Sequence, residues 1–296
     1  MSELPHTPVL MQEFLSFFED LKIKIFVDGT LGAGGHSLEI LKSHPEIETL
    51  VGFDQDQSAI EIAKSKLSPF KEKVIFIESN FCDMDKELKK IGVDQVEGIF
   101  VDIGVSSMQL DQKERGFSFS KEGPLDMRMD RNCELTAEDI INDYSQDEIG
   151  EILRDYGDLN NWRFIASKIV EVRAEKRIKT TLELAQLLSP YVKKNPQKKL
   201  HPMTLVFQAL RIAVNNELKV LDYFLPIGVD LLKKKGRLGV ISFHSGEDRI
   251  VKNTFREMAL KKQLKLLNKK PIGPSDEECQ INPRARSSKM RFIEKL

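Results

Sequence analysis

Four short apolar runs recur in the first hundred residues, and each is followed by residues typical of a turn or a helix. The runs span residues 25–27, 50–53, 74–77 and 98–101. Strands and helices that alternate in this way predict a parallel sheet with right-handed crossover connections. The alternation therefore restricts the N-terminal part of the chain to an α/β fold.

Three of these runs end in an acid. Asp28, Asp54 and Asp102 each stand at the carboxyl end of a different expected strand. In an open α/β sheet this edge lines the ligand crevice. A single acid at such a place could simply cap a helix, but three of them beside a glycine-rich turn predict a binding site.

The glycine-rich turn lies in the stretch 26–36, FVDGTLGAGGH, between the first expected strand and a helix. Glycines let the backbone turn tightly and approach a nucleotide-like ligand. Asp54 follows Gly34 by twenty residues, close to the spacing at which an acid takes ribose hydroxyls. Nicotinamide and sulfonium cofactors both fit these observations, although residues 32–37 lack the third glycine of the nicotinamide pattern.

Composition excludes several classes of protein. The 296 residues are 41% apolar, with a net charge of −1, and no apolar run approaches the length of a membrane span. The start of the chain lacks a secretion signal. Three scattered cysteines predict a cytoplasmic protein without a disulfide framework or metal site. Local clusters of basic residues, at 193–199, 233–237 and 261–270, are either solvated helix ends or nucleic-acid contacts.

After Asp102 the alternation stops. Thr136, Ser145 and Thr180 each precede an acid by three residues, the capping-box pattern of a helix start. This pattern predicts a helical insertion at 106–205, carried on a domain made of 1–105 and 206–296. The entry of the insertion, 109–131, reads as a long structured loop, a type of segment that is often functional.

The sheet is expected to resume after the insertion. Residues 204–221 have helical periodicity, and Gln208, Arg211 and Asn215 share its polar face, which could be solvated or could suit a ligand. A fifth strand, 237–243, leads to His244 at the ligand edge. Residues 264–268 and 288–293 read as a closing antiparallel pair. The apolar stripe of an N-terminal helix at 9–19 would pack inside, or would allow a homodimer.

Several longer strings together resemble a known family. They are HTPVL, DGTLGAGGHS, DIGVSSMQLD, RGFSF, GPLDMRMD, FQALRIAVNNEL, ISFHSGEDRIVK and NPRARSSKMR. These strings resemble the bacterial cytosine-N4 methyltransferases of small-subunit ribosomal RNA, the MraW family. The resemblance implies a Rossmann-like class I methyltransferase sheet, mostly parallel with an antiparallel C-terminal hairpin, and S-adenosylmethionine as cofactor. It also implies ribosomal RNA or the assembled small subunit as partner.

The resemblance also implies roles for individual residues. The residues expected to hold S-adenosylmethionine are Gly34, Gly35, His36, Asp54, Phe81, Asp102 and Gln109. Asp54 would take the ribose, and Phe81 would lie beside the adenine. Two departures from the family pattern are Gly246, where relatives more often carry leucine, and the segment 159–163, which contains the only tryptophan.

Methyl transfer to an exocyclic amine requires positioning and a group that accepts the amine's hydrogen. The aromatic motif that many amino-methyltransferases carry after the fourth strand is absent after Asp102. Asp102, Asn215 and His244 are therefore the candidate catalytic residues. Arg115, Arg128, Lys198 and Lys199 are the expected phosphate contacts in the insertion.

Two alternatives remain open from the sequence. The chain could methylate another RNA amine or a protein, or it could hold RNA without catalysis. Transfer of a labelled methyl group to ribosomal RNA would separate the three.

Overall fold

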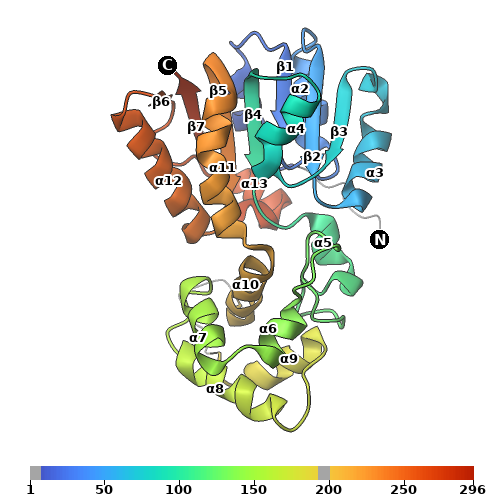
Figure 1. Cartoon of the computed structure of the whole chain (residues 1–296), viewed down its shortest axis with the longest axis vertical. Helices are drawn as coiled ribbons and strands as arrows, with labels where there is room; N and C mark the ends of the chain where they lie inside the picture. The colour runs from blue at the N-terminus through green and yellow to red at the C-terminus, as the bar shows by residue number, and fades with distance from the viewer. Residues whose placement is uncertain (1–7, 193–200) are drawn as a thin grey trace. The chain divides into compact units, whose positions relative to one another are not determined.

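The computed structural model describes residues 8–192 and 201–296, and it divides into two compact units (Figure 1). The sheet unit comprises Met1–Gly104 and Leu218–Leu296, and the helical unit comprises Val105–Glu217. Each unit has a hydrophobic core of its own. The two units are therefore described separately.

The sheet unit is built on a seven-stranded sheet in the order β3-β2-β1-β4-β5-β7-β6. The strands are β1 (Ile25–Asp28), β2 (Thr49–Asp54), β3 (Val74–Glu78), β4 (Val96–Asp102), β5 (Leu232–Ser242), β6 (Leu264–Leu266) and β7 (Lys289–Lys295). Strands β1 to β5 pair in parallel, whereas β7 runs antiparallel to both β5 and β6. The predicted class I methyltransferase sheet, with its antiparallel C-terminal hairpin, is confirmed.

Helices cover both faces of the sheet, which explains why the strands are apolar throughout. Helices α4 (Met84–Lys90), α11 (Glu217–Leu231) and α12 (Ser245–Leu260) supply one core cluster. Helices α1 (Met11–Phe18), α2 (Gly35–Ser43) and α3 (Gln57–Lys66) supply the other. The short α13 (Asp276–Ile281) lies in the segment between β6 and β7. The apolar stripe of α1 is internal, because Phe14 and Phe18 are fully buried.

Two elements differ from the sequence prediction. The helix expected at 204–221 is divided, because Asn216 adopts a left-handed conformation (φ 50°) between α10 (Pro202–Asn215) and α11. Strand β5 begins at Leu232 rather than at residue 237, and its pairing with β4 shifts register between Val96 and Gly98.

The helical unit contains α5 (Ser107–Asp111), α6 (Ala137–Asp143), α7 (Gln146–Asp155), α8 (Trp162–Arg173), α9 (Thr181–Leu188) and α10. Its three expected helix starts carry complete capping boxes at Thr136, Ser145 and Thr180. The apolar face of α10 packs on α6 and α7. For this reason α10 belongs to the helical unit, whereas the expected boundary assigned residues from 206 onward to the sheet domain.

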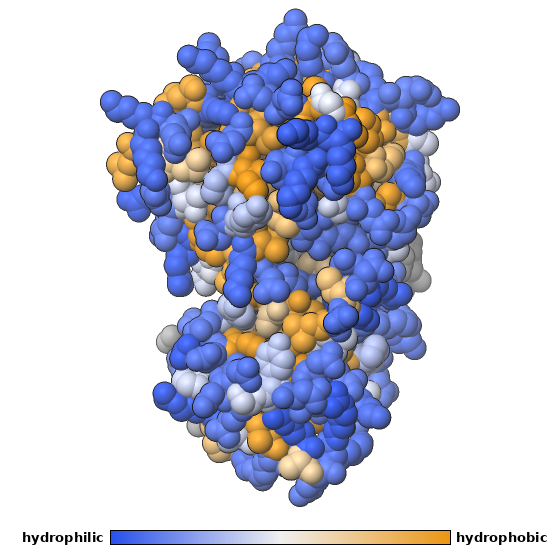
Figure 2. Space-filling view, viewed as in Figure 1, coloured by the Kyte–Doolittle hydropathy of each residue, from blue (hydrophilic) through white to orange (hydrophobic). Residues whose placement is uncertain are grey.

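Hydrophilic residues make up most of the surface of each unit on the face drawn in Figure 2. No described helix is both long enough and apolar enough to cross a membrane.

Candidate functional site

The glycine-rich turn is fixed by backbone hydrogen bonds to neighbouring strands. The Gly29 amide donates to the Phe100 carbonyl (2.8 Å), and the Leu31 amide donates to the Phe53 carbonyl (2.8 Å). Gly32 and Gly34 have φ of +50° and +74°, in the left-handed region that favours glycine. The turn therefore holds its shape at the carboxyl edge of β1 and opens α2.

Asp54, at the end of β2, is tied to this turn. Its Oδ2 accepts the Gly32 amide (2.8 Å), and its Oδ1 accepts the Asp56 amide (2.9 Å). Burial, the largest influence, raises the Asp54 pKa to about 6. Each carboxylate oxygen can accept a second hydrogen bond. Asp54 can therefore fix the turn and still receive two hydroxyls of a ligand.

Asp28, at the end of β1, is committed to the local structure. Its side chain is 1% exposed, and it accepts the Ser37 hydroxyl (2.7 Å) and the Thr30 amide (3.1 Å). Burial raises its pKa to about 6, against the opposing effect of these hydrogen bonds. Asp28 thus connects the end of β1 to the first turn of α2.

Asp102, at the end of β4, has an oxygen with no partner. Its amide donates to the Thr30 hydroxyl (2.6 Å), but its buried Oδ1 accepts no hydrogen bond from the described residues. Burial raises the Asp102 pKa well above its usual range, and the charges of Asp28 and Glu247 raise it further. A quarter of the side-chain surface remains exposed although Oδ1 itself is buried, so a ligand can reach part of this side chain.

His36 lies under the turn rather than on its surface. Its ring packs against both Phe14 and Phe100, with ring centroids 4.9 and 4.7 Å away. Its Nε2 lies 3.0 Å from the Val9 carbonyl, which can only accept, so this nitrogen carries a hydrogen. Its Nδ1 lies 3.9 Å from Asp102 Oδ2. The ring therefore lies beside Asp102 within the core.

Gly35 and Phe81 shape the walls on either side of the turn. A Cβ added to Gly35 would lie 2.4 Å from Pro8 Cγ, so the residue allows the N-terminal segment to approach α2 closely. Phe81 is 8% exposed and packs edge-on against Phe224 of α11. Beside it, the Asn80 amide donates to the Gln55 side chain (2.9 Å), which joins the loops after β3 and β2.

The electrostatics of this edge favour a cationic ligand. Asp28, Asp54 and Asp102 all have raised pKa values, which means that burial and mutual repulsion disfavour their charged forms. A bound cation beside them would reverse that effect. S-adenosylmethionine, the cofactor expected from the sequence, combines a sulfonium, an ammonium and a ribose, so the acids at this edge suit its positive charge.

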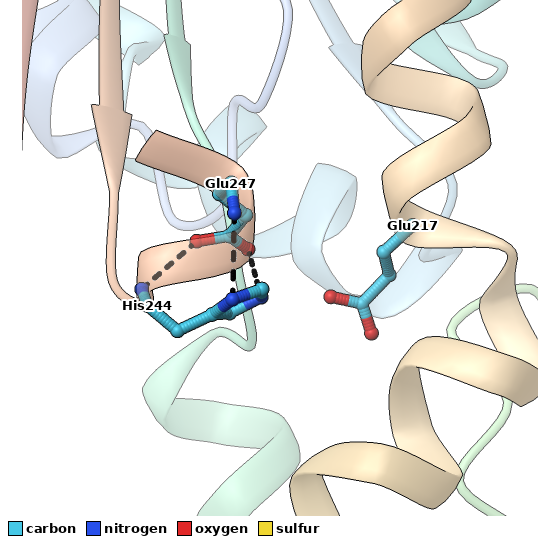
Figure 3. Close-up of side chains that lie close together, drawn as sticks. All are labelled: Glu217, His244 and Glu247. Atoms are coloured by element: carbon cyan, nitrogen blue, oxygen red, sulfur yellow. Dashed lines mark hydrogen bonds and ion pairs between the residues drawn. The ribbon is translucent and has the colours of Figure 1, made fainter. Parts of the chain in front are cut away.

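His244 caps α12 in the same unit. Its Nδ1 accepts the amides of Gly246 (3.2 Å) and Glu247 (3.4 Å), so the hydrogen of the neutral ring is on Nε2. Glu247 is fully buried, and its Oε2 accepts the Phe243 and His244 amides. Figure 3 shows the His244 ring and the Glu247 carboxylate facing each other, with Nε2 and Oε1 3.1 Å apart but outside hydrogen-bond geometry.

Gly246, the departure from the family pattern, leaves room for this cap. A Cβ added there would lie 3.1 Å from ring atoms of His244. The third side chain in Figure 3, Glu217, begins α11 and forms an ion pair with Arg211 (2.8 Å).

Asn215 and Gln109 lie in the helical unit and are both used locally. The Asn215 amide donates to the carbonyls of Met127 (2.8 Å) and Arg211 (2.9 Å), and its oxygen accepts the Met129 amide (2.7 Å). Gln109 completes a capping box with Ser106 at the start of α5. Asn215 therefore fixes the segment around Met127, and both of its donors are occupied.

The two arginines expected to bind phosphate serve the same long loop. Arg115 is 3% exposed and donates to the carbonyls of Arg128 and Met129. Arg128 pairs with Asp126 through two hydrogen bonds and also donates to two loop carbonyls. The structure thus gives both a structural role. Lys198 and Lys199 lie outside the described residues.

Sequence reasoning missed Thr30, Gly32 and Glu247. Thr30 joins β1 to β4, the Gly32 amide binds Asp54, and Glu247 contributes to the raised pKa of Asp102. A glutamate three residues after the cap residue His244 was the available sequence signal for Glu247.

Comparison with known proteins identifies the family. A family model described as "MraW methylase family" matches residues 3–296. A protein of Protochlamydia amoebophila named "Ribosomal RNA small subunit methyltransferase H" is 50% identical, covering 99% of this chain and 98% of its own. Two further proteins have the same name. The one from Persephonella marina is 48% identical, covering 98% of this chain and 99% of its own length. The one from Clostridioides difficile is 42% identical, covering 99% of this chain and 100% of its own length. The family model and these relatives match nearly the whole length of the chain, and the chain therefore belongs to the MraW methylase family.

Proposed function

We propose that this chain transfers a methyl group from S-adenosylmethionine to the exocyclic N4 amine of a cytidine in small-subunit ribosomal RNA. The observation that carries the proposal is the edge where Asp28, Asp54 and Asp102 meet beside the glycine turn, because this edge favours a cationic ligand that contains a ribose. The relatives' printed name supplies the class of RNA.

Asp102 is the proposed acceptor for the amine. S-adenosylmethionine supplies an electrophilic methyl group when it is bound. The partly exposed side chain of Asp102 can accept a hydrogen bond from the amine, which keeps the nitrogen oriented for attack. A neighbouring positive charge lowers the pKa of this carboxyl group and so favours the ionised form that accepts the hydrogen.

His244 and Asn215 are proposed as positioning residues. His244 holds the first turn of α12, where the buried Glu247 influences Asp102. Asn215 holds the backbone of Met127 and Met129 in the helical unit. If His244→Ala and Asn215→Ala each kept the full single-turnover rate at saturating RNA, these roles would be wrong. Asp102→Asn should lose most of the rate even when S-adenosylmethionine is saturating.

The helical unit is proposed to recognise the RNA. Phe164 on α8 is 48% exposed, with the Lys168 ammonium 5.8 Å from its ring centroid, and the Arg163 guanidinium lies over Trp162. Exposed aromatic rings beside cations suit unpaired bases and phosphates. Phe164→Ala should weaken RNA binding without changing S-adenosylmethionine affinity, and equal RNA affinity would remove this surface from the proposal.

Small-subunit RNA as the substrate also implies a cytoplasmic protein, without a membrane partner. A homodimer remains a proposal, tested by light scattering at assay concentration. The α1 stripe that suggested a homodimer is buried inside the sheet unit, so another surface would have to form the interface.

The function is tested by incubating small-subunit ribosomal RNA, and separately the assembled subunit, with the protein and S-adenosylmethionine carrying a labelled methyl group. After nuclease digestion, mass spectrometry should find the label as N4-methylcytidine in either the free ribosomal RNA or the RNA of the assembled subunit. Label in another nucleoside or only in protein would favour the alternative substrates, and no transfer with retained RNA binding would favour a non-catalytic module.

A further inference from the structure

A surface hollow in the sheet unit lies apart from the carboxyl edges of β1 and β2. Its volume is about 390 Å³, and its walls come from α12, the end of β6 and β7. The residues that form it include Lys252, Arg256, Asn268, Lys269, Arg291 and Phe292. None of these residues has a place in the methyl-transfer site described above.

The hollow has an excess of positive charge. Arg291 is 7% exposed and is neutralised by Asp248 through contacts of 2.7 and 3.3 Å. Within the described part of the chain, Lys252, Arg256 and Lys269 have no recorded ion pair. The nearby Glu257 on α12 is already paired with Lys261 (2.7 Å). Three cationic side chains therefore face the hollow without a local counter-charge.

The geometry holds these cations in place. Asp248, Lys252 and Arg256 follow one another at four-residue intervals on α12, so they share one helix face. The Asp248–Arg291 pair ties that face to β7. On the opposite wall, the Asn268 side chain bonds to the Lys270 and Met290 carbonyls and to the Phe292 amide, which fixes the loop that carries Lys269.

The floor of the hollow shows which part of a ligand it can take. Phe255 and Phe292 are each 1% exposed, so neither offers a ring face on which a base could stack. Recognition is left to charge and to lysine and arginine hydrogen bonds, which suit a phosphate group. The hollow therefore matches the backbone of a nucleic acid better than it matches a whole nucleotide.

The hollow also lies within reach of an RNA held at the methyl-transfer site. Strand β7 is two positions from β4 in the sheet, a separation of roughly 10 Å at the usual strand spacing. Lys252 follows Glu247 by five residues on α12, which is roughly 7.5 Å along the helix. Both lengths correspond to a short stretch of RNA beside the target base.

We infer that this hollow, the α12–β7 phosphate site, binds a backbone phosphate of the substrate RNA near the methylated base. The inference rests on the proposed function, since it takes RNA as the substrate. The contact does not depend on which base the nucleotide carries. It would anchor the RNA backbone on the sheet unit, in addition to the RNA contacts proposed for the helical unit.

The test compares two double variants of the full chain that remove the same charge. Lys252→Gln with Arg256→Gln alters the site, and Lys89→Gln with Lys90→Gln on α4 is the control. Fluorescence anisotropy measures binding of a labelled small-subunit ribosomal RNA fragment from 50 to 300 mM KCl. S-adenosylmethionine affinity, measured by calorimetry, should equal that of the unaltered protein in both variants and so reports correct folding.

The site variant should bind RNA about 5- to 25-fold more weakly at 0.1 M salt, with a log–log salt slope shallower by about 0.7 to 1.4. The control should keep the original slope. An unchanged slope in the site variant, or an equal change in the control, would overturn the inference. Inorganic phosphate, at matched ionic strength, should weaken RNA binding to the unaltered protein more than to the site variant, and equal weakening of the two would contradict a phosphate contact at this site. Methyl transfer by the unaltered protein to the same RNA, scored in parallel, tests the proposed function separately.

Discussion

The substitution Asp54→Asn tests how the sheet unit binds its cofactor. Both Asp54 oxygens accept backbone amides, from Gly32 and Asp56, and each retains room for a ribose hydroxyl. Asparagine keeps one acceptor oxygen and loses the charge. A hydrogen bond to a charged group is worth about 1.5–3 kcal/mol, so losing one should weaken S-adenosylmethionine binding by about 10- to 150-fold.

The pH dependence sharpens this prediction. Because burial raises the Asp54 pKa to about 6, the carboxylate is ionised at pH 7.5 and mostly protonated at pH 5. Cofactor affinity of the unaltered protein should therefore fall as the pH falls, by about 10-fold between these values from Asp54 alone. Asp28 and Asp102 also titrate, so the informative quantity is the difference between the two proteins. Between pH 7.5 and pH 5, the fold-loss of S-adenosylmethionine affinity should be about 10 times smaller in the Asp54→Asn variant than in the unaltered protein.

Isothermal titration calorimetry with S-adenosylmethionine at pH 7.5 and 5.0 measures both effects. Asp94→Asn, at an exposed acid in the loop before β4, is a control with the same change of charge, and it should behave as the unaltered protein does. If Asp54→Asn bound the cofactor with unaltered affinity at pH 7.5, Asp54 would not contact the ribose. If both proteins lost affinity equally at pH 5.0, the raised pKa would not matter for binding.

Three further predictions concern stability. Gly35→Ala places a Cβ 2.4 Å from Pro8 Cγ and should destabilise the fold by about 1–3 kcal/mol, seen as a lower Tm; an unchanged Tm would show that the N-terminal segment gives way. Asp28 has a pKa of about 6 when folded, against 3.8 for a solvent-exposed aspartate, so the folded state binds protons more tightly and the free energy of unfolding falls as the pH rises through that window. Asp28→Asn should remove this slope and raise stability at pH 7.5 by up to about 3 kcal/mol, and urea unfolding that gave parallel pH profiles would contradict it. Asn142→Ala removes hydrogen bonds to the amide and carbonyl of Ile178 and should destabilise the helical unit by about 2–4 kcal/mol, as measured by the same method.

The sheet could be predicted because its strands are short, apolar on both faces and separated by helices. Each of the first four strands begins and ends within two residues of the ends of the apolar run that predicted it. The break at Asn216 could not be predicted, because the polar and apolar periodicity of 204–221 continues through it. Its left-handed backbone depends on the separate packing of α10 and α11.

The candidate site was only partly predictable for a similar reason. The positions of Asp28, Asp54 and Asp102 follow from the strand ends, but their side-chain roles depend on neighbours that are distant in sequence. The Asp54 bond to Gly32 and the Asp102 bond to Thr30 each cross between strands. The packing of His36 against Phe14 and Phe100 depends on how α1 covers the sheet, which periodicity alone does not fix.

The most direct test of the proposed function is the fate of the methyl group. Small-subunit ribosomal RNA and assembled subunits are incubated with labelled S-adenosylmethionine and either the unaltered protein or Asp102→Asn, and the digested RNA is analysed by mass spectrometry. We predict labelled N4-methylcytidine at a single position with the unaltered protein, and little or none with Asp102→Asn at a saturating concentration of the cofactor. Label in another nucleoside, or equal transfer by the two proteins, would contradict the proposed chemistry.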